Sequence, residues 1–460
     1  MANKNIIRTL MVDIPSVPGS LGKLATAIGL SGGDIGEVET IQVGPNYTTR
    51  NITVQVEHEE QLSELLEAIH RLEGGFRIHT VSDEVLRSHE GGKIHMKSKM
   101  PIESLADLRR VYTPGVADVC RVIEEEPEKA GIYTSIGNTV AIVTDGTAIL
   151  GLGDIGPVAG MPVMEGKSAL FDQLAGINGV PILLNTKDPD QIVQTVKNIS
   201  LGFSGILLED IASPHCFEVE ERLKKELDIP VMHDDQHGTA VVTLAAVISA
   251  CKSAGVDLRK ARVGQIGLGA AGLAICRMMM TYGVKNVIGT DKSLEAKARL
   301  ENYGGDSVDS IEKLMECSDI VIATTGVPGL IKKEWVRQGQ VVLALSNPKP
   351  EIEPEDAQQA GAVYAADGRS VNNVLGFPGI FRGVLNAGSN EITHSMLVAA
   401  AEAIAACTKT GDLVPHPLDP NVHKMVAKAV ESASYLSDRE VKQQRICVQR
   451  KIHKKIPVFQ

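Results

Sequence analysis

The chain has 460 residues, and this length predicts two to four domains rather than a single core. The formal net charge of −11 argues against a nucleic-acid binder, because a phosphate backbone requires a basic face. Seven scattered cysteines without a CxxC pair argue against a disulfide scaffold or a thiolate zinc site. The sequence shows neither a signal-peptide pattern nor an apolar stretch of membrane-spanning length. We therefore expect a cytoplasmic protein without nucleic-acid or membrane partners.

Residues 1–86 are expected to form a small unit with the element order βαββαβ. A strand and a helix are followed by two strands that meet at Gly44-Pro45-Asn46, then by a second helix and a closing strand. The second helix is indicated by apolar residues at helical spacing, namely Leu62, Leu65, Leu66, Ile69 and Leu72. No catalytic cluster occurs in this unit, and the break in pattern at residues 88–93 predicts a linker.

Between residues 93 and 236, apolar strand candidates alternate with helical segments. The strands are expected at Val140–Val143, Pro181–Leu184, Gly205–Leu208 and Pro230–Met232, and the helices include Asp190–Ser200 and Pro214–Leu227. Ser213 is the expected N-cap of the second of these helices, with Pro214 at its first position. Such alternation predicts an α/β domain with a mostly parallel sheet.

A second α/β domain is predicted for residues 237–410, after a long apolar helix at Ala240–Ala254. Its first strand, Arg262–Ile266, leads into a GxGxxG motif at residues 267–272, which opens the helix Ala270–Tyr282. The next strand, Asn286–Thr290, ends at Asp291. This context is the dinucleotide-binding fingerprint of a Rossmann-type sheet. An acidic residue in the place of Asp291 would bind the adenosine ribose hydroxyls and repel a 2′-phosphate, which favours NAD over NADP.

The residues of the motif have distinct expected roles in cofactor binding. Gly267 allows a tight turn, Gly269 lets the backbone approach the pyrophosphate, and Gly272 lets helix and strand pack closely. The pyrophosphate would sit at the helix N-terminus, where Ala270 and Ala271 begin the helix.

The rest of the predicted NAD-binding domain contributes further strands at Ile320–Thr324, Val341–Leu345 and Ala362–Ala365. From about residue 388 the chain is expected to be mostly helical. Residues 411–460 form a predicted C-terminal helical tail whose end is basic.

Carboxylates follow two of the predicted strands directly. Glu209 and Asp210 come after Gly205–Leu208, and His233-Asp234-Asp235 comes after Pro230–Met232. Parallel neighbours in an open α/β sheet place their carboxyl ends together, so these acids are expected to converge on an oxygen-rich site for Mg²⁺ or Mn²⁺. Two alternatives stay open at this point: a zinc site that uses His233 and His237, and acids that merely cap helices.

Lys167 and Tyr112 are candidate acid–base residues. Lys167 stands in a short Gly-Lys-Ser segment that is expected to be a turn before an apolar helix. It could bind phosphate, act as a general base with a pKa lowered by a nearby divalent cation, or lie on the surface. Tyr112, one of seven tyrosines, is on its own more typical of a packed turn residue.

Eight segments, in this order, resemble the malic enzymes, in particular the short prokaryotic kind. They are VYTPGVA, VTDGTAILGLGDIGP, MEGKSALF, LLEDI, HDDQHGTA, IGLGAAG, ALSNP and NNVLGFPG, and the match spans about residues 95–410. The first unit is similar to an ACT domain, a regulatory module that often binds small effectors around the glycine matching Gly19.

The resemblance implies NAD-dependent oxidative decarboxylation of L-malate to pyruvate in a homodimer or homotetramer. It implies that Tyr112 is the general acid, Lys167 the general base, and Asp234 a further catalytic residue next to the metal ligands. The implied metal ligands are Glu209, Asp210 and Asp235. Asn347 and Asn373 would hold the substrate, and Asn347 would also contact the nicotinamide.

The sequence departs from the larger, animal-type enzymes at Ala148. Those enzymes have an arginine at this position that pairs with a malate carboxylate. Arg109, Arg110 or a residue of a partner subunit could neutralise that carboxylate here. The alternatives are a malolactic enzyme on the same scaffold, an NADP-preferring malic enzyme, another NAD-dependent dehydrogenase, and an ACT-headed sensor without catalysis.

Overall fold

A computed structural model describes residues 6–149, 151–347, 349–369 and 371–435. The chain divides into two compact units, Met1–His95 and Met96–Gln460. The predicted basic end of the tail and Cys447 lie outside the described residues.

The first unit is a four-stranded antiparallel sheet with two helices, in the predicted order βαββαβ. The elements are β1 (Ile6–Pro15), α1 (Ser20–Leu30), β2 (Asp34–Val43), β3 (Tyr47–Val56), α2 (Glu59–His70) and β4 (Arg77–Ser82), followed by the short helix α3 (Glu84–His89). The strand order is β2-β3-β1-β4. Alternate residues of β1 (Leu10, Val12 and Ile14) point into a core shared with Leu65 and Ile69 of α2. This arrangement is compatible with an ACT domain.

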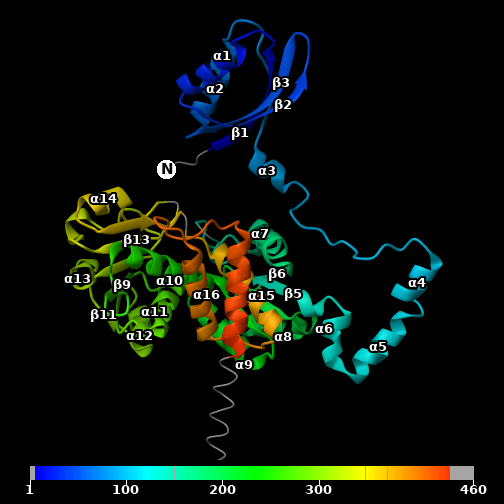
Figure 1. Ribbon diagram of the computed structural model, residues 1–460, viewed down its shortest axis with the longest axis vertical. Helices are drawn as coiled ribbons and strands as arrows, with labels where there is room; N and C mark the ends of the chain where they lie inside the picture. The colour runs from blue at the N-terminus through cyan, green and yellow to red at the C-terminus, as the bar shows by residue number, and fades with distance from the viewer. Residues whose placement is uncertain (1–5, 150, 348, 370, 436–460) are drawn as a thin grey trace, which may run out of the picture. The chain divides into compact units, whose positions relative to one another are not determined.

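The second unit begins with an extended segment, residues 96–133, which we call the arm. It contains α4 (Leu105–Val111), α5 (Val116–Glu125), the turn η1 (Pro127–Lys129) and α6 (Ala130–Tyr133), and η2 (Ile136–Asn138) connects it to the first strand of the sheet. Neither α4 nor α5 has a buried residue, and both project away from the sheets of this unit (Figure 1). The arm therefore exposes many apolar side chains, including Ile102, Leu105, Leu108, Val116, Val119, Ile132 and Tyr133.

The sheet that follows has four parallel strands in the order β6-β5-β7-β8. These strands are β5 (Thr139–Thr144), β6 (Asn178–Leu183), β7 (Gly205–Leu208) and β8 (Val231–His233), with the helices α7 (Pro157–Ala175), α8 (Pro189–Ile199) and α9 (His215–Glu226) and the turn η3 (Ser200–Gly202) between them. All four strands lie where the sequence predicted them, within a few residues. The prediction of the α9 cap was wrong, because Pro214 rather than Ser213 occupies the N-cap and no side chain caps the helix.

The long helix α10 (Asp234–Ala254) starts six residues earlier than predicted, directly after β8. Its first turn thus contains Asp234 and Asp235, where the helix dipole favours negative charge. The helix is long and apolar enough to cross a membrane, but 72% of its most apolar window is buried inside the protein. It packs against helices of the following domain, so its composition reflects a core position.

A six-stranded parallel sheet follows, with the strand order β11-β10-β9-β12-β13-β14 of a Rossmann-type domain. Its strands are β9 (Arg262–Ile266), β10 (Asn286–Thr290), β11 (Asp306–Ser307), β12 (Ile320–Ala323), β13 (Val341–Ala344) and β14 (Tyr364–Asp367). Its helices are α11 (Ala270–Tyr282), α12 (Leu294–Asn302), α13 (Ile311–Cys317) and α14 (Pro354–Gln359), with the turn η4 (Lys333–Trp335). Strand β14 begins two residues later than predicted. The N–H of Ala362 donates to Ala357 O at the end of α14 and is therefore not available to the sheet.

The last described segment, residues 373–435, is mostly helical, whereas the sequence predicts helices only from about residue 388 onward. It comprises η5 (Asn373–Leu375), α15 (Phe377–Ala387), α16 (His394–Cys407) and a helix over residues 420–435. Phe377 and Phe381 of α15 make edge-to-face contacts with Phe171 of α7, with ring centroids 4.9 and 5.5 Å apart. These contacts tie the end of the chain back to the four-stranded sheet domain.

Candidate active site

The carboxyl ends of β5, β7 and β8 meet at one edge of the four-stranded sheet. The strand register pairs Val143 with Leu208 and Leu208 with His233. The residues that follow these positions are therefore neighbours, which brings Glu209 and Asp210 beside Asp234 and Asp235. Since β6 and β7 lie on opposite sides of β5, this edge includes a topological switch point, the usual ligand site of an open α/β sheet.

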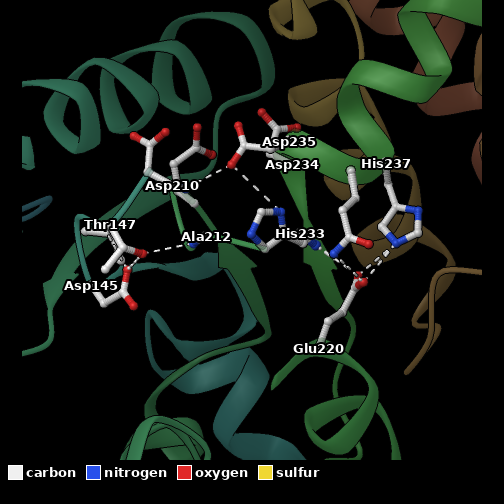
Figure 2. Close-up of polar contacts among 12 residues, drawn as sticks. Asp145, Thr147, Asp210, Ala212, Glu220, His233, Asp234, Asp235 and His237 are labelled. Carbon is white, nitrogen blue, oxygen red and sulfur yellow. Dashed lines mark hydrogen bonds and ion pairs between the residues drawn. The ribbon is translucent and has the colours of Figure 1, made fainter. Parts of the chain in front are cut away.

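The predicted metal ligands converge. One carboxylate oxygen from each of Glu209, Asp210 and Asp235 lies within 4.8 Å of the others. Glu209 and Asp210 are buried, and Glu209 Oε2 and Asp210 Oδ2 have no hydrogen-bond partner. Buried carboxylate oxygens without a partner are costly unless a cation faces them, so this donor set fits Mg²⁺ or Mn²⁺. Figure 2 shows Asp210 and Asp235 from their two strand ends, with Asp210 N donating to Asp235 Oδ2 at 3.0 Å.

Lys167 reaches the same cluster from the middle of α7, so the predicted Gly-Lys-Ser turn was wrong. The helix continues through Gly160, Pro162 and Gly166, since tertiary packing overrides their weak helix propensity. Lys167 is only 7% exposed. Its Nζ lies 3.1 Å from Glu209 Oε1, donates a hydrogen bond to Asp234 Oδ2, and lies 4.4 Å from the centroid of the Phe377 ring.

The site concentrates negative charge around this one amine. Burial alone would lower the pKa of Lys167, but the charges of Asp234 and Glu209 outweigh it and raise that pKa. Burial raises the pKa of Asp210 to about 7, and the neighbouring charge of Asp235 adds to the shift. Burial likewise raises the pKa of Glu209 and of Asp234, against the opposing effect of Lys167. Without a cation, the cluster therefore retains protons that a metal ion would displace.

A further buried carboxylate, outside the acidic cluster, stabilises the connection between β8 and α10. Glu220 of α9 accepts hydrogen bonds from His233 N at 3.0 Å, Gln236 Nε2 at 3.2 Å and His237 Nε2 at 3.0 Å (Figure 2). Among the described residues, the only group of potential ligands that converges on one point is the acidic set, and it contains neither histidine. The zinc alternative therefore lacks a converging set of ligands.

The glycine motif has the geometry of a dinucleotide loop. Gly267 has a φ of +88°, and a Cβ at Gly272 would lie 1.9 Å from Gly267 O, so both positions require glycine. A Cβ at Gly269 would meet nothing within 4 Å, which leaves open space beside the loop. Asp291 accepts from Leu268 N at 2.7 Å, which ties the end of β10 to the loop. Ala270 and Ala271 are the first two residues of α11, as predicted.

The two candidate asparagines occupy different places. A Cβ at Gly238 would lie 1.9 Å from Asp234 Oδ1 and 3.4 Å from Asn373 Cβ, so Asn373 lies beside Asp234 across this glycine. Asn347 follows β13, and its Nδ2 donates to Gly368 O at 3.1 Å. Asn373 is thus near the acidic cluster, whereas Asn347 lies at the carboxyl edge of the six-stranded sheet.

Tyr112 and the two arginines are not gathered with the other candidates. Tyr112 is the C-cap of α4, its side chain is 66% exposed, and no described residue makes a hydrogen bond or ion pair with that side chain. Arg109 and Arg110 lie on the same arm helix, where Arg110 pairs with Asp107. All three residues belong to the projecting arm (Figure 1).

A Rossmann-type sheet next to a buried lysine and converging carboxylates defines the class of a dinucleotide-dependent oxidoreductase. Comparisons with known proteins identify the family within this class. The chain matches the models "Malic enzyme, N-terminal domain" at residues 91–224 and "Malic enzyme, NAD binding domain" at residues 361–439. Residues 233–328 match "D-isomer specific 2-hydroxyacid dehydrogenase, NAD binding domain".

Full-length relatives agree with these matches. The chain is 77% identical to NAD-dependent malic enzyme 1 of Bacillus subtilis, over 94% of this chain and 99% of that protein. It is 43% identical to the bifunctional malic/malolactic enzyme of Bacillus subtilis, over 77% of this chain and 93% of that protein. The crystal structure of NAD-dependent malic enzyme from Thermotoga maritima is 40% identical, with a TM-score of 0.72 over 76% of this chain and 99% of that chain. The chain belongs to the malic enzyme family, which confirms the predicted resemblance and the two predicted α/β domains.

We predict that Asp210→Asn stabilises the metal-free protein while abolishing its stabilisation by Mn²⁺. Because the pKa of Asp210 is about 7 in the folded protein and near 4 in an unfolded chain, the metal-free protein should lose stability as pH rises from about 4 through 7. Asparagine removes this charge and tolerates a positive φ. At pH 8 in chelator, the difference of about three between the folded and unfolded pKa of Asp210 corresponds to a gain of at most about 4 kcal/mol in the free energy of unfolding.

The measurement is thermal unfolding from pH 5 to pH 8, with EDTA and with Mn²⁺. The exposed Asp228, just before β8, supplies the control variant Asp228→Asn, which should behave like the wild type. A wild-type melting temperature that does not fall with pH in EDTA would contradict the buried-charge argument.

Proposed function

We propose that the chain oxidises L-malate with NAD, releasing carbon dioxide and pyruvate. The observation that carries this proposal is the buried Lys167 among Glu209, Asp210, Asp234 and Asp235, in a chain with a Rossmann-type domain. The predicted activity is borne out by the 77% identical relative, whose name is NAD-dependent malic enzyme 1.

Glu209, Asp210 and Asp235 would hold the divalent ion, and the loop at residues 267–272 would hold NAD. A bound ion supplies a Lewis acid for the α-hydroxy acid, and bound NAD supplies the acceptor for the C2 hydride. The unpartnered oxygens of Glu209 and Asp210 support this assignment of the ligands.

Lys167 would remove the proton of the C2 hydroxyl. Its amine is charged in the metal-free protein, because two carboxylates raise its pKa. A cation that offsets those carboxylates would lower this pKa and free the amine to act as a base. Asp234, hydrogen-bonded to Nζ, would orient the amine, and the Phe377 ring would exclude water from one side. Asn373 would hold the substrate, and its position beside Asp234 supports this role.

Tyr112 would protonate C3 of the enolate that remains after decarboxylation. Its exposed position on the arm supports an assembly in which the arm of one subunit packs against the other subunit. The exposed apolar side chains of the arm need such a partner surface, since apolar patches of this kind mark interfaces. We therefore propose a homodimer, alone or within a tetramer, whose active site combines Lys167 of one copy with Tyr112 of the other. The same arm would bring Arg109 or Arg110 to the malate carboxylate that Ala148 cannot neutralise.

The first unit is proposed to be an ACT domain that binds a small effector. Its element order and antiparallel sheet support this assignment. Gly19 is the N-cap of α1 and has a φ of +89°, and a Cβ there would meet nothing within 4 Å, which leaves room for a ligand. The predicted cytoplasmic location and the predicted domain limits stay predictions.

Malolactic activity is the second candidate. The 43% identical relative named a bifunctional malic/malolactic enzyme favours it as an additional activity of this scaffold. In that reaction the nicotinamide is reoxidised before release, and lactate rather than pyruvate leaves the site. NADP as the preferred cofactor is disfavoured by the carboxylate of Asp291 beside the glycine loop.

We predict that the purified protein converts L-malate and NAD to equal amounts of pyruvate and NADH. EDTA should abolish the reaction and Mn²⁺ should restore it, because the carboxylate cluster needs a cation. The measurement is NADH absorbance with pyruvate and lactate quantified separately. Lactate without accumulated NADH would favour malolactic activity, and faster turnover with NADP would contradict the role given to Asp291.

We predict that Lys167→Ala lowers kcat by at least about a hundredfold, since a general base contributes ~10²–10⁴-fold. Lys187→Ala is the matched control, because Lys187 pairs with Asp154 at a neighbouring strand end and is more than half exposed. The control should retain wild-type kcat in steady-state assays with saturating Mn²⁺. A Lys167→Ala enzyme that keeps more than a tenth of wild-type kcat would rule out the base assignment.

We predict that two inactive variants, Tyr112→Phe and Lys167→Ala, regain activity when they form mixed dimers. In a mixed dimer one active site has both wild-type residues and the other has neither. Random assortment of equal amounts gives mixed dimers in half of the population, so about a quarter of wild-type activity should return. The variants are refolded together and assayed beside each one alone. If Tyr112 acts within its own chain, the mixture will be as inactive as its components.

A further inference from the structure

Asp210, a proposed metal ligand, lies in a turn with an unfavourable backbone conformation. Its φ is +54°, and among the described residues it is the only non-glycine residue with a positive φ. The left-handed region is unfavourable for an L-residue, although aspartate tolerates it better than most. Such a turn persists only when its surroundings hold it, so the contacts around Asp210 decide whether its carboxylate faces the site.

Two hydrogen bonds hold the backbone N–H and carbonyl groups of Asp210. Its N–H donates to Asp235 Oδ2 at 3.0 Å, and its carbonyl accepts from Ala148 N at 2.9 Å. The first bond depends on a carboxylate that is itself a proposed ligand. The second bond depends on the position of the loop after β5, which contains Ala148. Other contacts must therefore fix the position of this loop.

The loop after β5 makes a third contact with the turn, through a threonine hydroxyl. Ala212 N, two residues after Asp210, donates to Thr147 Oγ1 at 2.9 Å. Thr147 Oγ1 donates to Asp145 Oδ1 at 2.6 Å. Asp145 Oδ1 also accepts a hydrogen bond from Thr147 N at 3.0 Å (Figure 2). Because the single hydroxyl proton goes to Asp145, the lone pairs of Thr147 Oγ1 are left to accept from Ala212.

We propose that Thr147 is a positioning residue for the metal site, which holds Asp210 toward the cation through Ala212. Asp145, only 2% exposed, orients the hydroxyl and thereby completes a chain from the end of β5 to the end of β7. The inference rests on the proposed role of Asp210 as a ligand. It assigns to Thr147 and Asp145 a part in metal binding although neither belongs to the proposed ligand set.

The experiment compares Thr147→Val, which has a similar shape but no hydroxyl, with Thr147→Ser, which keeps the hydroxyl. Mn²⁺ binding is measured by titration calorimetry without malate or NAD, so that activity is not the readout. We expect Thr147→Val to weaken Mn²⁺ binding by about tenfold, the effect of one lost hydrogen bond. Thr147→Ser should stay within about twofold of the wild type.

Thr186→Val is the matched control. Thr186 lies in the loop after β6 of the same sheet and is also half-buried, but its hydroxyl oxygen accepts from Asp188 N at 3.2 Å rather than from the turn that contains Asp210. It should bind Mn²⁺ like the wild type. In steady-state assays, Thr147→Val should raise the apparent KM for Mn²⁺ while kcat at saturating Mn²⁺ changes by less than about threefold. If Thr147→Val fails to fold in EDTA, Thr147→Ala takes its place with the same expected weakening.

Equal Mn²⁺ affinity in wild type and Thr147→Val would overturn the inference, and so would equal weakening in the valine and serine variants. Asp210→Asn separates this failure from that of the proposed function. If Asp210→Asn binds Mn²⁺ like the wild type, the ligand role of Asp210 fails. If Asp210→Asn loses Mn²⁺ binding and Thr147→Val does not, only the role of Thr147 fails.

Discussion

The constraint on which this molecule depends is an imbalance of buried charge. Four carboxylates, those of Glu209, Asp210, Asp234 and Asp235, gather around the single amine of Lys167. Like charges in a poorly solvated place raise the free energy of the folded state, unless protons or a cation compensate them. Under the proposed assignment, the same arrangement would bind a divalent ion where a hydroxy acid and a base can meet, which would compensate this cost. Stability and function therefore oppose each other at this edge of the sheet.

The sheet topology explains why much of the site could be predicted from the sequence. Acids directly after two apolar strands must lie together if the strands are parallel neighbours, and the pairing of Leu208 with His233 places them so. The dinucleotide-binding motif can also be predicted from the sequence, because the backbone geometry at Gly267 and Gly272 requires glycine. Both predictions depended on local patterns whose spatial consequence is determined by the parallel α/β fold.

The remaining features depend on contacts between distant segments, which local patterns do not encode. Lys167 was expected in a turn, yet helix α7 continues through its glycines and a proline because its buried face packs on β5 and β6. Thr147 lies in the segment VTDGTAILGLGDIGP, but the family resemblance gave it no role, and Glu220 lies in none of the eight segments. Each accepts a hydrogen bond from a backbone N–H of another segment, a contact that the local sequence does not encode. The proposed binding partner of the arm is a second copy of the chain, which a single sequence does not represent.

Ala148, where the animal-type enzymes have an arginine, links the metal site to the proposed subunit interface. The backbone N–H of Ala148 donates to the carbonyl oxygen of Asp210, a proposed metal ligand, and any residue except proline would keep that bond. The methyl side chain of alanine cannot neutralise a carboxylate, so a group from another part of the assembly would have to neutralise malate. If the arm supplies that group together with Tyr112, substrate binding and proton transfer both require the subunit interface. An isolated subunit would then hold the cation and the base but lack the acid, so that assembly, rather than metal binding, would complete the site.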